Sequence, residues 1–377
     1  MISNQQQPPA WRILVVDDDP QIGRQVKERA DLLDENAPYH LQVTATERFE
    51  EALRLLEAAA FDLLVIDVRG QGEGDPDNEI GVRTLKEIQA RRFIPTVFYT
   101  GLPALVNYLA TPLVRVVEKT EGVERLLAIA GELIDTKLPH LNRALLSHVQ
   151  GVQADYMWKF VAQHWTALAE ERDGLTLAYL LARRLSASLT PGQIGKLAEA
   201  LGNTPGDLPQ GDNVHAAEYY LMPSLTDAPS LAGDIYSFPE GHYRVLLTPS
   251  CDLVRKKCEF TLWAGCIHLS ETSEYKAWAA DKTKEKPLRA LMRNNRDKQP
   301  DRYFFLPGAY TVPDLVVDFE RLSHTSYGEL DQSRRIASLD SPFVESLLSR
   351  FARFFGRLGT PDLETSLVMA RLNSPKG

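Results

Sequence analysis

Four apolar runs in the first third of the chain are each followed by a polar residue whose side chain could act in catalysis or in ligand binding. The runs cover residues 13–16, 63–66, 97–99 and 116–117. Uninterrupted apolar runs of this kind are typical of strands buried on both faces of a parallel sheet. The polar residues at their ends are, in order, Asp17 with Asp18, Asp67, Thr100 and Lys119. Because sites in open α/β sheets form at the carboxyl ends of the strands, these five side chains are expected to meet.

The segments between the runs predict helices. Residues 47–59 and 82–88 place apolar side chains near helical spacing, namely Phe49, Leu53, Leu56 and Ala60 in the first and Val82, Leu85 and Ile88 in the second. Strand and helix then alternate along the chain. This alternation predicts right-handed βαβ units and a doubly wound, flavodoxin-like α/β sheet of about five parallel strands.

The predicted site has the groups that phosphoryl transfer requires. When a carboxylate attacks a phosphoryl donor, its own negative charge and that of the donor must both be neutralised. A divalent cation and a lysine can do this together. Mg²⁺ prefers oxygen ligands, so Asp18, Asp67 and the backbone carbonyl of Arg69 are the expected direct ligands, with Asp17 acting through water. Asp19 precedes Pro20 and is expected to be a helix cap outside this set.

Over about residues 11–137, this arrangement resembles the receiver domain of two-component response regulators. The resemblance implies that Asp67 takes a phosphoryl group from the phosphohistidine of a sensor histidine kinase, while Asp17 and Asp18 bind Mg²⁺. It further implies that Thr100 turns toward the phosphoryl oxygens and that Lys119 pairs with them. Each residue alone has an ordinary structural explanation, but the ordered set of strand ends favours a receiver. Other receiver proteins that share the kinase are implied as indirect partners.

The chain departs from the receiver pattern in two places. Residues 70–79 form a long, glycine-rich, acidic insertion, which either tunes Mg²⁺ affinity and kinase choice or is a tolerated surface loop. On the face that usually transmits phosphorylation, Val116 replaces a switch aromatic and Thr120 replaces a proline. Pro103 and Pro112 leave little room for a helix before Lys119. The sequence therefore supports phosphoryl acceptance better than it supports dimerisation, the usual response of receivers to phosphorylation.

Length and composition suggest two or three domains in an ordinary globular chain. The 377 residues are 44% hydrophobic and 25% charged, with a net charge of −9 that disfavours bulk attraction to nucleic acid. A Gln/Pro-rich start and the lack of long apolar runs predict a cytoplasmic protein without membrane contact. The expected division is a disordered tail at 1–10, a receiver at 11–137, a helical segment at 138–205 and an α+β module at 206–377.

The helical segment invites a comparison with helix-turn-helix proteins. Residues 189–205 have the pattern of a capped helix, a glycine turn and the start of a second helix. That second helix would be short and acidic, with no Arg or Lys to reach DNA. DNA binding by this segment is therefore not expected.

The C-terminal module has the pattern of a small antiparallel sheet or barrel. Expected strands lie at 233–238 and 242–248, joined as a hairpin, and at 260–267, 303–306 and 315–319. Residues 341–356 predict an amphipathic docking helix. Residues 279–302 are rich in Lys and Arg, which suits phosphate or nucleic acid, although interrupting acidic residues favour a solvated helix and loop.

This module also holds all three cysteines. Cys251, Cys258 and Cys266, with Asp252 and His268 and also His242, suggest either a zinc site or a Cys251 nucleophile with His268 as base. No CxxC pair is present, and the spacing matches no common zinc module. Reduced structural thiols are the default alternative.

Three functions remain open from the sequence. The first is a phosphorylation switch in a two-component phosphorelay, and the second is a phosphate sink that drains a shared kinase without an output. Residues 248–252 and the whole-chain order weakly resemble receiver proteins of Detocs-type antiphage two-component systems, some of which are proposed sinks, and this resemblance implies antiviral defence. The third is a receiver-controlled enzyme using Cys251 and Asp252; otherwise only self-phosphotransfer and autodephosphorylation are expected. The sequence leaves a homodimer open.

Overall fold

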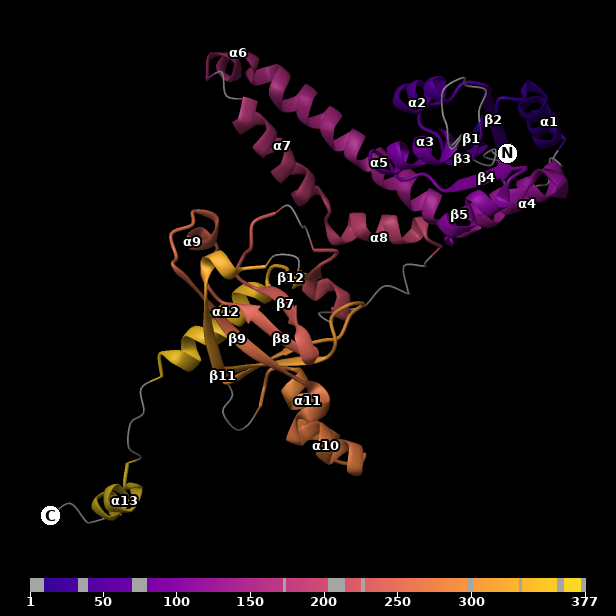
Figure 1. The fold of residues 1–377 in the computed structure, drawn as a ribbon. Helices are drawn as coiled ribbons and strands as arrows, with labels where there is room; N and C mark the ends of the chain where they lie inside the picture. Colours follow the sequence, from indigo (N-terminus) through magenta and orange to yellow (C-terminus); the bar gives the residue numbers. More distant parts are fainter. Residues whose placement is uncertain are drawn as a thin grey trace, which may run out of the picture. The chain divides into compact units, whose positions relative to one another are not determined.

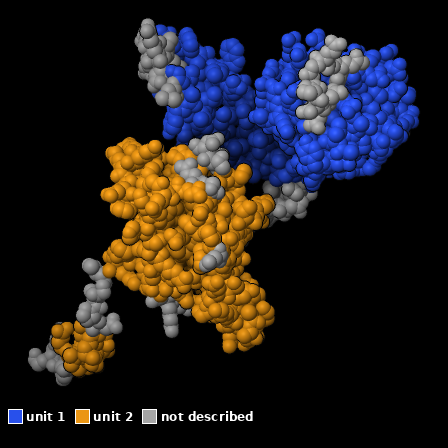
Figure 2. Space-filling view, in the orientation of Figure 1, with its two compact units in different colours: residues 1–208 blue, residues 209–377 orange. Residues whose placement is uncertain are grey.

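The computed structural model describes residues 10–32, 40–69, 80–171, 174–202, 214–224, 228–296, 301–331, 334–357 and 363–373 (Figure 1). The chain forms two compact units, residues 1–208 and 209–377 (Figure 2), and each is described by itself. The predicted insertion at 70–79, the tail before Ala10 and the Gly/Pro-rich segment at 203–213 lie outside the described residues. No helix in the described ranges is long and apolar enough to cross a membrane.

A five-stranded parallel sheet forms the centre of the first unit, as the sequence predicts. Its strands are β1 (Ala10–Val16), β2 (His40–Thr46), β3 (Leu63–Ile66), β4 (Thr96–Thr100) and β5 (Val114–Glu118). They are arranged in the order β2-β1-β3-β4-β5, which is the doubly wound, flavodoxin-like order. The order reverses beside β1, so the carboxyl ends of β1 and β3 adjoin at the place where such sheets carry sites.

Helices cover both faces of this sheet (Figure 1). Apolar side chains of α1 (Pro20–Asp31) and α4 (Gly122–Asp135) bury one face, and those of α2 (Phe49–Ala58) and α3 (Ile80–Gln89) bury the other. Between β4 and β5 there is no α-helix but two 3₁₀ turns, η1 (Pro103–Leu105) and η2 (Asn107–Leu109). The short, proline-limited connection expected from the sequence is therefore confirmed.

A helical extension follows α4. It comprises α5 (Leu138–Tyr156), a π-helical turn η4 (Met157–Val161), α6 (Ala162–Glu171), α7 (Gly174–Ser188) and α8 (Pro191–Ala200). Arg143 of α5 holds the extension against the end of the sheet at which strands β1 and β3 begin. Its guanidinium lies 4.0 Å from the Trp11 ring centre, and its Nη2 donates to Asp62 Oδ2 at 2.6 Å. The partners of Arg143 were not singled out from the sequence, because they lie more than 80 residues away.

The second unit contains a seven-stranded antiparallel sheet, which confirms the predicted sheet-based α+β class. Its strands are β6 (Tyr220–Leu221), β7 (Asp234–Phe238), β8 (His242–Leu246), β9 (Phe260–His268), β10 (Tyr303–Leu306), β11 (Leu315–Ser326) and β12 (Arg335–Leu339). The order is β10-β11-β9-β8-β7-β12-β6. The hairpin of β7 and β8 forms as predicted, whereas β6 and β12 were not anticipated.

Helices pack on both faces of the second sheet. Leu347 and Phe354 of α12 (Phe343–Phe355) join the core on one face, which confirms the predicted docking helix. The opposite face packs against Leu253 of α9 (Ser250–Val254) and against α11 (Glu285–Met292). Two further helices, α10 (Ser273–Ala280) and α13 (Thr365–Asn373), complete the unit.

Close packing at Gly81 fixes the position of Asp67. A Cβ added to Gly81 would lie 1.9 Å from the Asp67 carbonyl oxygen, so either α3 or the end of β3 would have to move. We expect Gly81→Ala to lower the free energy of unfolding of the first unit by about 1–3 kcal/mol, measured by urea unfolding. Gly151→Ala on α5 is the matched control. Nothing lies within 4 Å of its added methyl group, so a gain of about 0.5–1 kcal/mol is expected. Equal effects of the two substitutions would contradict this explanation.

Candidate functional site at the carboxyl ends of β1, β3, β4 and β5

Backbone hydrogen bonds place Asp17 and Asp67 side by side. The Asp67 amide donates to the Val16 carbonyl at 2.9 Å, and the Asp17 amide donates to the Thr46 carbonyl at 3.2 Å. These bonds extend the pairing of β1 with β3 and β2 by one residue past the strand ends. Both side chains are therefore held at the same edge of the sheet.

Lys119 bridges the two carboxylates. Its Nζ lies 2.8 Å from Asp17 Oδ2 and 2.7 Å from Asp67 Oδ2. The Asp17 and Asp67 side chains are only 3% and 10% exposed, so the three charges interact out of bulk water. The remaining oxygens accept backbone hydrogen bonds, Asp17 Oδ1 from the Asp19 amide at 3.0 Å and Asp67 Oδ1 from the Val68 amide at 2.6 Å. Each carboxylate is thus held at both oxygens.

The half-buried Asp18 completes an acidic cluster with these two residues. Asp17, Asp18 and Asp67 each offer an oxygen within 4.8 Å of the others, the one group of this kind among the residues that the structure describes. An all-oxygen donor set suits Mg²⁺. Arg69 follows Asp67 by two residues, and Asp19 caps α1 by accepting from the Gln21 amide at 2.8 Å. The donor chemistry therefore fits the predicted metal.

Thr100 and Tyr99 line the neighbouring strand end. Thr100 is 1% exposed, and its Oγ1 accepts a hydrogen bond from the Leu102 amide at 3.2 Å. Thr100 pairs with Glu118 across β4 and β5, which places it beside the strand end that carries Lys119. The Tyr99 hydroxyl donates to the Lys119 carbonyl at 3.4 Å. Tyr99 had no predicted role, because its position within an apolar run of the sequence indicates burial and nothing more.

Burial and the shared lysine set the electrostatics of the site. Burial is the largest influence on Asp17 and raises the pKa of its carboxyl, although Lys119 and the Asp19 amide oppose that change. Burial alone would lower the pKa of Lys119. The hydrogen bonds and charges of Asp17 and Asp67 together outweigh burial and raise it. Lys119 therefore stays protonated at neutral pH, between two carboxylates that need a cation.

The direction of the Asp17 shift predicts how stability depends on pH. A folded-state pKa above the ordinary 3.8 means that the folded chain binds a proton more tightly than the unfolded chain does. The free energy of unfolding therefore falls as the pH rises from the ordinary pKa through the raised one. Lys119 affects stability at alkaline pH. Because its pKa is raised in the folded state, its contribution to the free energy of unfolding is lost only above pH 10.5.

We expect Asp17→Asn to raise the free energy of unfolding at pH 7 without Mg²⁺, because the substitution removes a carboxylate charge that burial disfavours. The gain should shrink toward pH 3, where the wild-type carboxyl is protonated. Urea unfolding over a pH series, followed by hydrogen exchange in β1 and β3, measures this. A variant less stable than wild type at pH 7 would show that the charged Asp17 is net stabilising.

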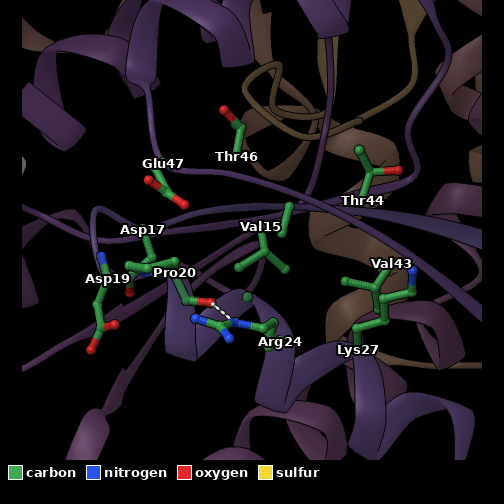
Figure 3. Close-up of a pocket in the computed structure, with 12 residues that line it drawn as sticks. Val15, Asp17, Asp19, Pro20, Arg24, Lys27, Val43, Thr44, Thr46 and Glu47 are labelled. Carbon is green, nitrogen blue, oxygen red and sulfur yellow. Dashed lines mark hydrogen bonds between the residues drawn. The ribbon is translucent and has the colours of Figure 1, made fainter.

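A groove of about 610 Å³ lies on the side of Asp17 that faces α1 and β2 (Figure 3). Asp17 and Asp19 form one end of its wall, with Glu47 from the loop after β2, while Lys27 lies farther along α1. Arg24 is folded back on its own helix, where its Nε donates to the Pro20 carbonyl at 3.2 Å. The groove brings charges of both signs to the border of the acidic cluster.

The structure separates the residues of the speculative second site. Cys251 is exposed on α9, and its Sγ lies 3.8 Å from Asp252 Oδ1. Cys258 is half-buried in an apolar cluster, and burial raises the pKa of the Cys266 thiol in β9 well above its usual value. His268 Nε2 bonds to the Gly241 carbonyl at 3.2 Å. Within the described ranges, these side chains form no metal-binding cluster.

Comparison with known proteins gives matches to part of the chain, and these are solved structures. No family model matches the chain, and neither does any curated protein. Among solved structures, response regulator TrrA from Thermotoga maritima, in complex with Mg²⁺ and BeF, is 25% identical over 33% of this chain and 98% of that one, with a TM-score of 0.26. A receiver protein from Sinorhizobium medicae is 25% identical over 33% and 94%, with a TM-score of 0.27.

A third match is chemotaxis response regulator CheY4 of Vibrio cholerae. It is 21% identical over 33% of this chain and 99% of that one, with a TM-score of 0.25. Scores this low carry no argument by themselves. The first unit has a receiver-type fold on the evidence of its own strand order and its acidic strand ends.

Proposed function

We propose that this protein accepts a phosphoryl group on Asp67 from the phosphohistidine of a sensor histidine kinase, in a Mg²⁺-dependent step of two-component signalling. The observation that carries the proposal is the position of Lys119, which bridges Asp67 and Asp17 beside Asp18. A buried carboxylate beside a fixed cation and two further carboxylates is suited to phosphoryl chemistry. An ordinary surface ion pair would need neither the burial nor the additional acids.

In the transfer step, a carboxylate oxygen of Asp67 attacks the phosphorus atom in line with the bond to the kinase histidine. That phosphorus–nitrogen bond breaks, and the histidine nitrogen keeps the electron pair. Lys119 stabilises the charge on the transferring group, since its Nζ already lies 2.7 Å from Asp67 Oδ2. Asp18, Asp67 and the Arg69 carbonyl would hold Mg²⁺, with Asp17 acting through water, and the bound ion would supply the further positive charge that the phosphoryl oxygens require.

Thr100 is the proposed reporter of phosphorylation. Its hydroxyl lies at the end of the strand next to β3, in contact with the Leu102 amide at the start of the turns that replace a helix. Turning that hydroxyl toward a phosphoryl oxygen would release the amide and alter the η1 turn. Water then attacks the mixed anhydride and restores the carboxylate, so that the protein performs self-phosphotransfer and autodephosphorylation.

A phosphate sink is the second candidate function, and the connection between β4 and β5 favours it. Two 3₁₀ turns stand where a receiver that signals through a helix would need one, and Val116 in β5 supplies no aromatic switch. The link to Detocs-type antiphage systems belongs with this candidate and stays a prediction. An enzyme built on Cys251 and Asp252 gains no comparable support, since His268 bonds elsewhere. The cytoplasmic location, the four-part domain division and a homodimer also stay predictions.

The proposal is tested by phosphoryl uptake on a phosphate-affinity gel after incubation with Mg²⁺ and acetyl phosphate, and then with a phosphorylated histidine kinase. We expect wild type to shift and Asp67→Asn not to shift. Asp19→Asn is the matched control, because Asp19 lies next to the cluster but only caps α1. A shift retained by Asp67→Asn, or a wild type that takes up no phosphoryl group from either donor, would contradict the proposal.

A further inference from the structure

Helices α10 and α11 of the second unit carry a strongly basic surface that the proposed phosphoryl chemistry does not use. The basic surface consists of the exposed side chains Lys276, Lys282, Lys284, Lys286, Arg289 and Arg293. Residues 273–296 contain seven Lys and Arg and three Asp and Glu, so their net charge is +4 in a chain whose total is −9. The basic surface is therefore a local reversal of the charge of the whole molecule.

Most of these cations have no carboxylate partner among the described residues. Lys284 pairs with Asp281 at 3.8 Å, and Arg289 pairs with Glu285 at 3.1 Å. For the other four, Lys276, Lys282, Lys286 and Arg293, no carboxylate of the described residues lies within 4.0 Å. Four exposed and unpaired like charges on two adjacent helices repel one another, which costs stability unless an anion binds there.

Other arginines anchor the two helices. Arg296 pairs with Glu274 and lies 4.5 Å from the Tyr303 ring centre, and both paired side chains are less than a quarter exposed. Leu288 and Leu291 bury the inner side of α11 against β10 and β11. Lys286 and Arg293 can therefore be replaced without removing these contacts, and replacing Lys282 removes only its cation–π contact with Trp278.

The arrangement of the cations suits a polyanion with regularly spaced charges. Lys286 and Arg289 of α11 and Arg293, which directly follows the helix, are spaced at intervals of three and four, so they extend along one side of it over about 10 Å. Lys282, in the loop before α11, has its Nζ 3.4 Å from the Trp278 ring centre. Successive phosphates of one duplex strand rise about 3.4 Å along its axis, so the stripe spans several of them.

We propose that the basic surface of α10 and α11 binds the phosphodiester backbone of nucleic acid without reading base sequence. A bilayer would need large apolar side chains beside the cations, yet among the described residues of 273–296 only Met292 is an exposed large hydrophobic, at 39%. The proposal concerns a surface remote in sequence from residues 189–205, and it goes beyond phosphoryl acceptance.

The test is fluorescence anisotropy of the full chain with labelled duplex DNA, duplex RNA and single-stranded oligothymidine of equal length. Wild type is expected to bind in low salt. If the four unpaired cations each contact a phosphate of duplex DNA, the Kd should rise about 100-fold between 50 and 200 mM salt. The variant Lys282→Glu/Lys286→Glu/Arg293→Glu should weaken binding by at least about tenfold. The probe bound most tightly identifies the form of nucleic acid.

The matched control is Lys86→Glu/Arg183→Glu/Arg184→Glu, which makes the same change in net charge at exposed positions of the first unit. It should bind within about twofold of wild type, since its cations are outside the basic surface. Circular dichroism checks that both triple variants fold. An equal loss in the control, no wild-type binding to any of the three probes, or binding to phosphatidylserine vesicles alone would overturn the proposal.

Discussion

Replacing Lys119 with alanine is expected to slow phosphoryl transfer to Asp67 by about 10²–10³-fold. The Nζ of Lys119 is the one cation bonded to Asp67 among the described residues, and it is fixed in place by Asp17 as well. Without it, the attacking carboxylate and the incoming phosphoryl group would repel each other with only the metal to offset their charges. Because the position is preorganised, the loss should fall on the rate of transfer rather than on Mg²⁺ binding.

Initial rates with acetyl phosphate and saturating Mg²⁺ measure this effect. The control is Lys86→Ala, which removes an exposed lysine of α3 away from the strand ends. A Lys119→Ala variant that transfers at the wild-type rate would mean that the lysine only neutralises the unphosphorylated site. Restoration of the rate by Lys119→Arg would be consistent with a requirement for charge at this position.

The largest expected loss of stability follows from Arg335→Ala in the second unit. Arg335 and Asp234 form an ion pair at 3.0 Å, with side chains 2% and 0% exposed. The guanidinium also donates to the carbonyls of Ala228 and Pro229, and Asp234 Oδ1 accepts from the Ser338 hydroxyl at 2.6 Å. Removing the arginine would leave a buried carboxylate without its cation, which typically costs about 3–5 kcal/mol.

The adjacent Arg334→Ala is the matched control. The Arg334 side chain is 43% exposed and pairs with Asp331 at 3.1 Å, so its loss should cost less than about 1 kcal/mol. Urea unfolding followed by hydrogen exchange in β7 and β12 measures both variants. Similar losses for Arg334→Ala and Arg335→Ala would show that the buried pair is not a main determinant of the stability of this unit.

Much of the first unit and of its site could be predicted, because the sequence patterns that indicate them are local. Buried strands must be continuously apolar, so residues such as Val65 and Val97 mark them without knowledge of their neighbours. Parallel topology then brings the residues after β1, β3 and β4 to one edge, whatever the loop lengths. The meeting of Lys119 with Asp67 follows from the same geometry, whereas its second ion pair, with Asp17, was not predicted. The backbone bonds to Asp19 and Val68 do not, since they depend on turn conformations.

The second unit was less predictable because long-range pairing determines it. β6 has only two residues and pairs with β12 across more than 100 residues of sequence, so a local pattern did not indicate either strand. Asp234 and Arg335 look like ordinary surface charges until the pairing of β7 with β12 buries them together. The cysteines do not gather into one cluster, because the fold places them apart. Cys266 packs into the core of β9, while Cys251 lies on an exposed helix.

Asp67 is the residue that we propose to carry the phosphoryl group. The most direct measurement is the intact mass of the full chain after incubation with Mg²⁺ and acetyl phosphate, with borohydride reduction and peptide mapping of the modified residue. We expect one added phosphoryl group per chain, located on Asp67, dependent on Mg²⁺ and absent from Asp67→Ala. A group found on another residue, or one that persists in Asp67→Ala, would contradict it.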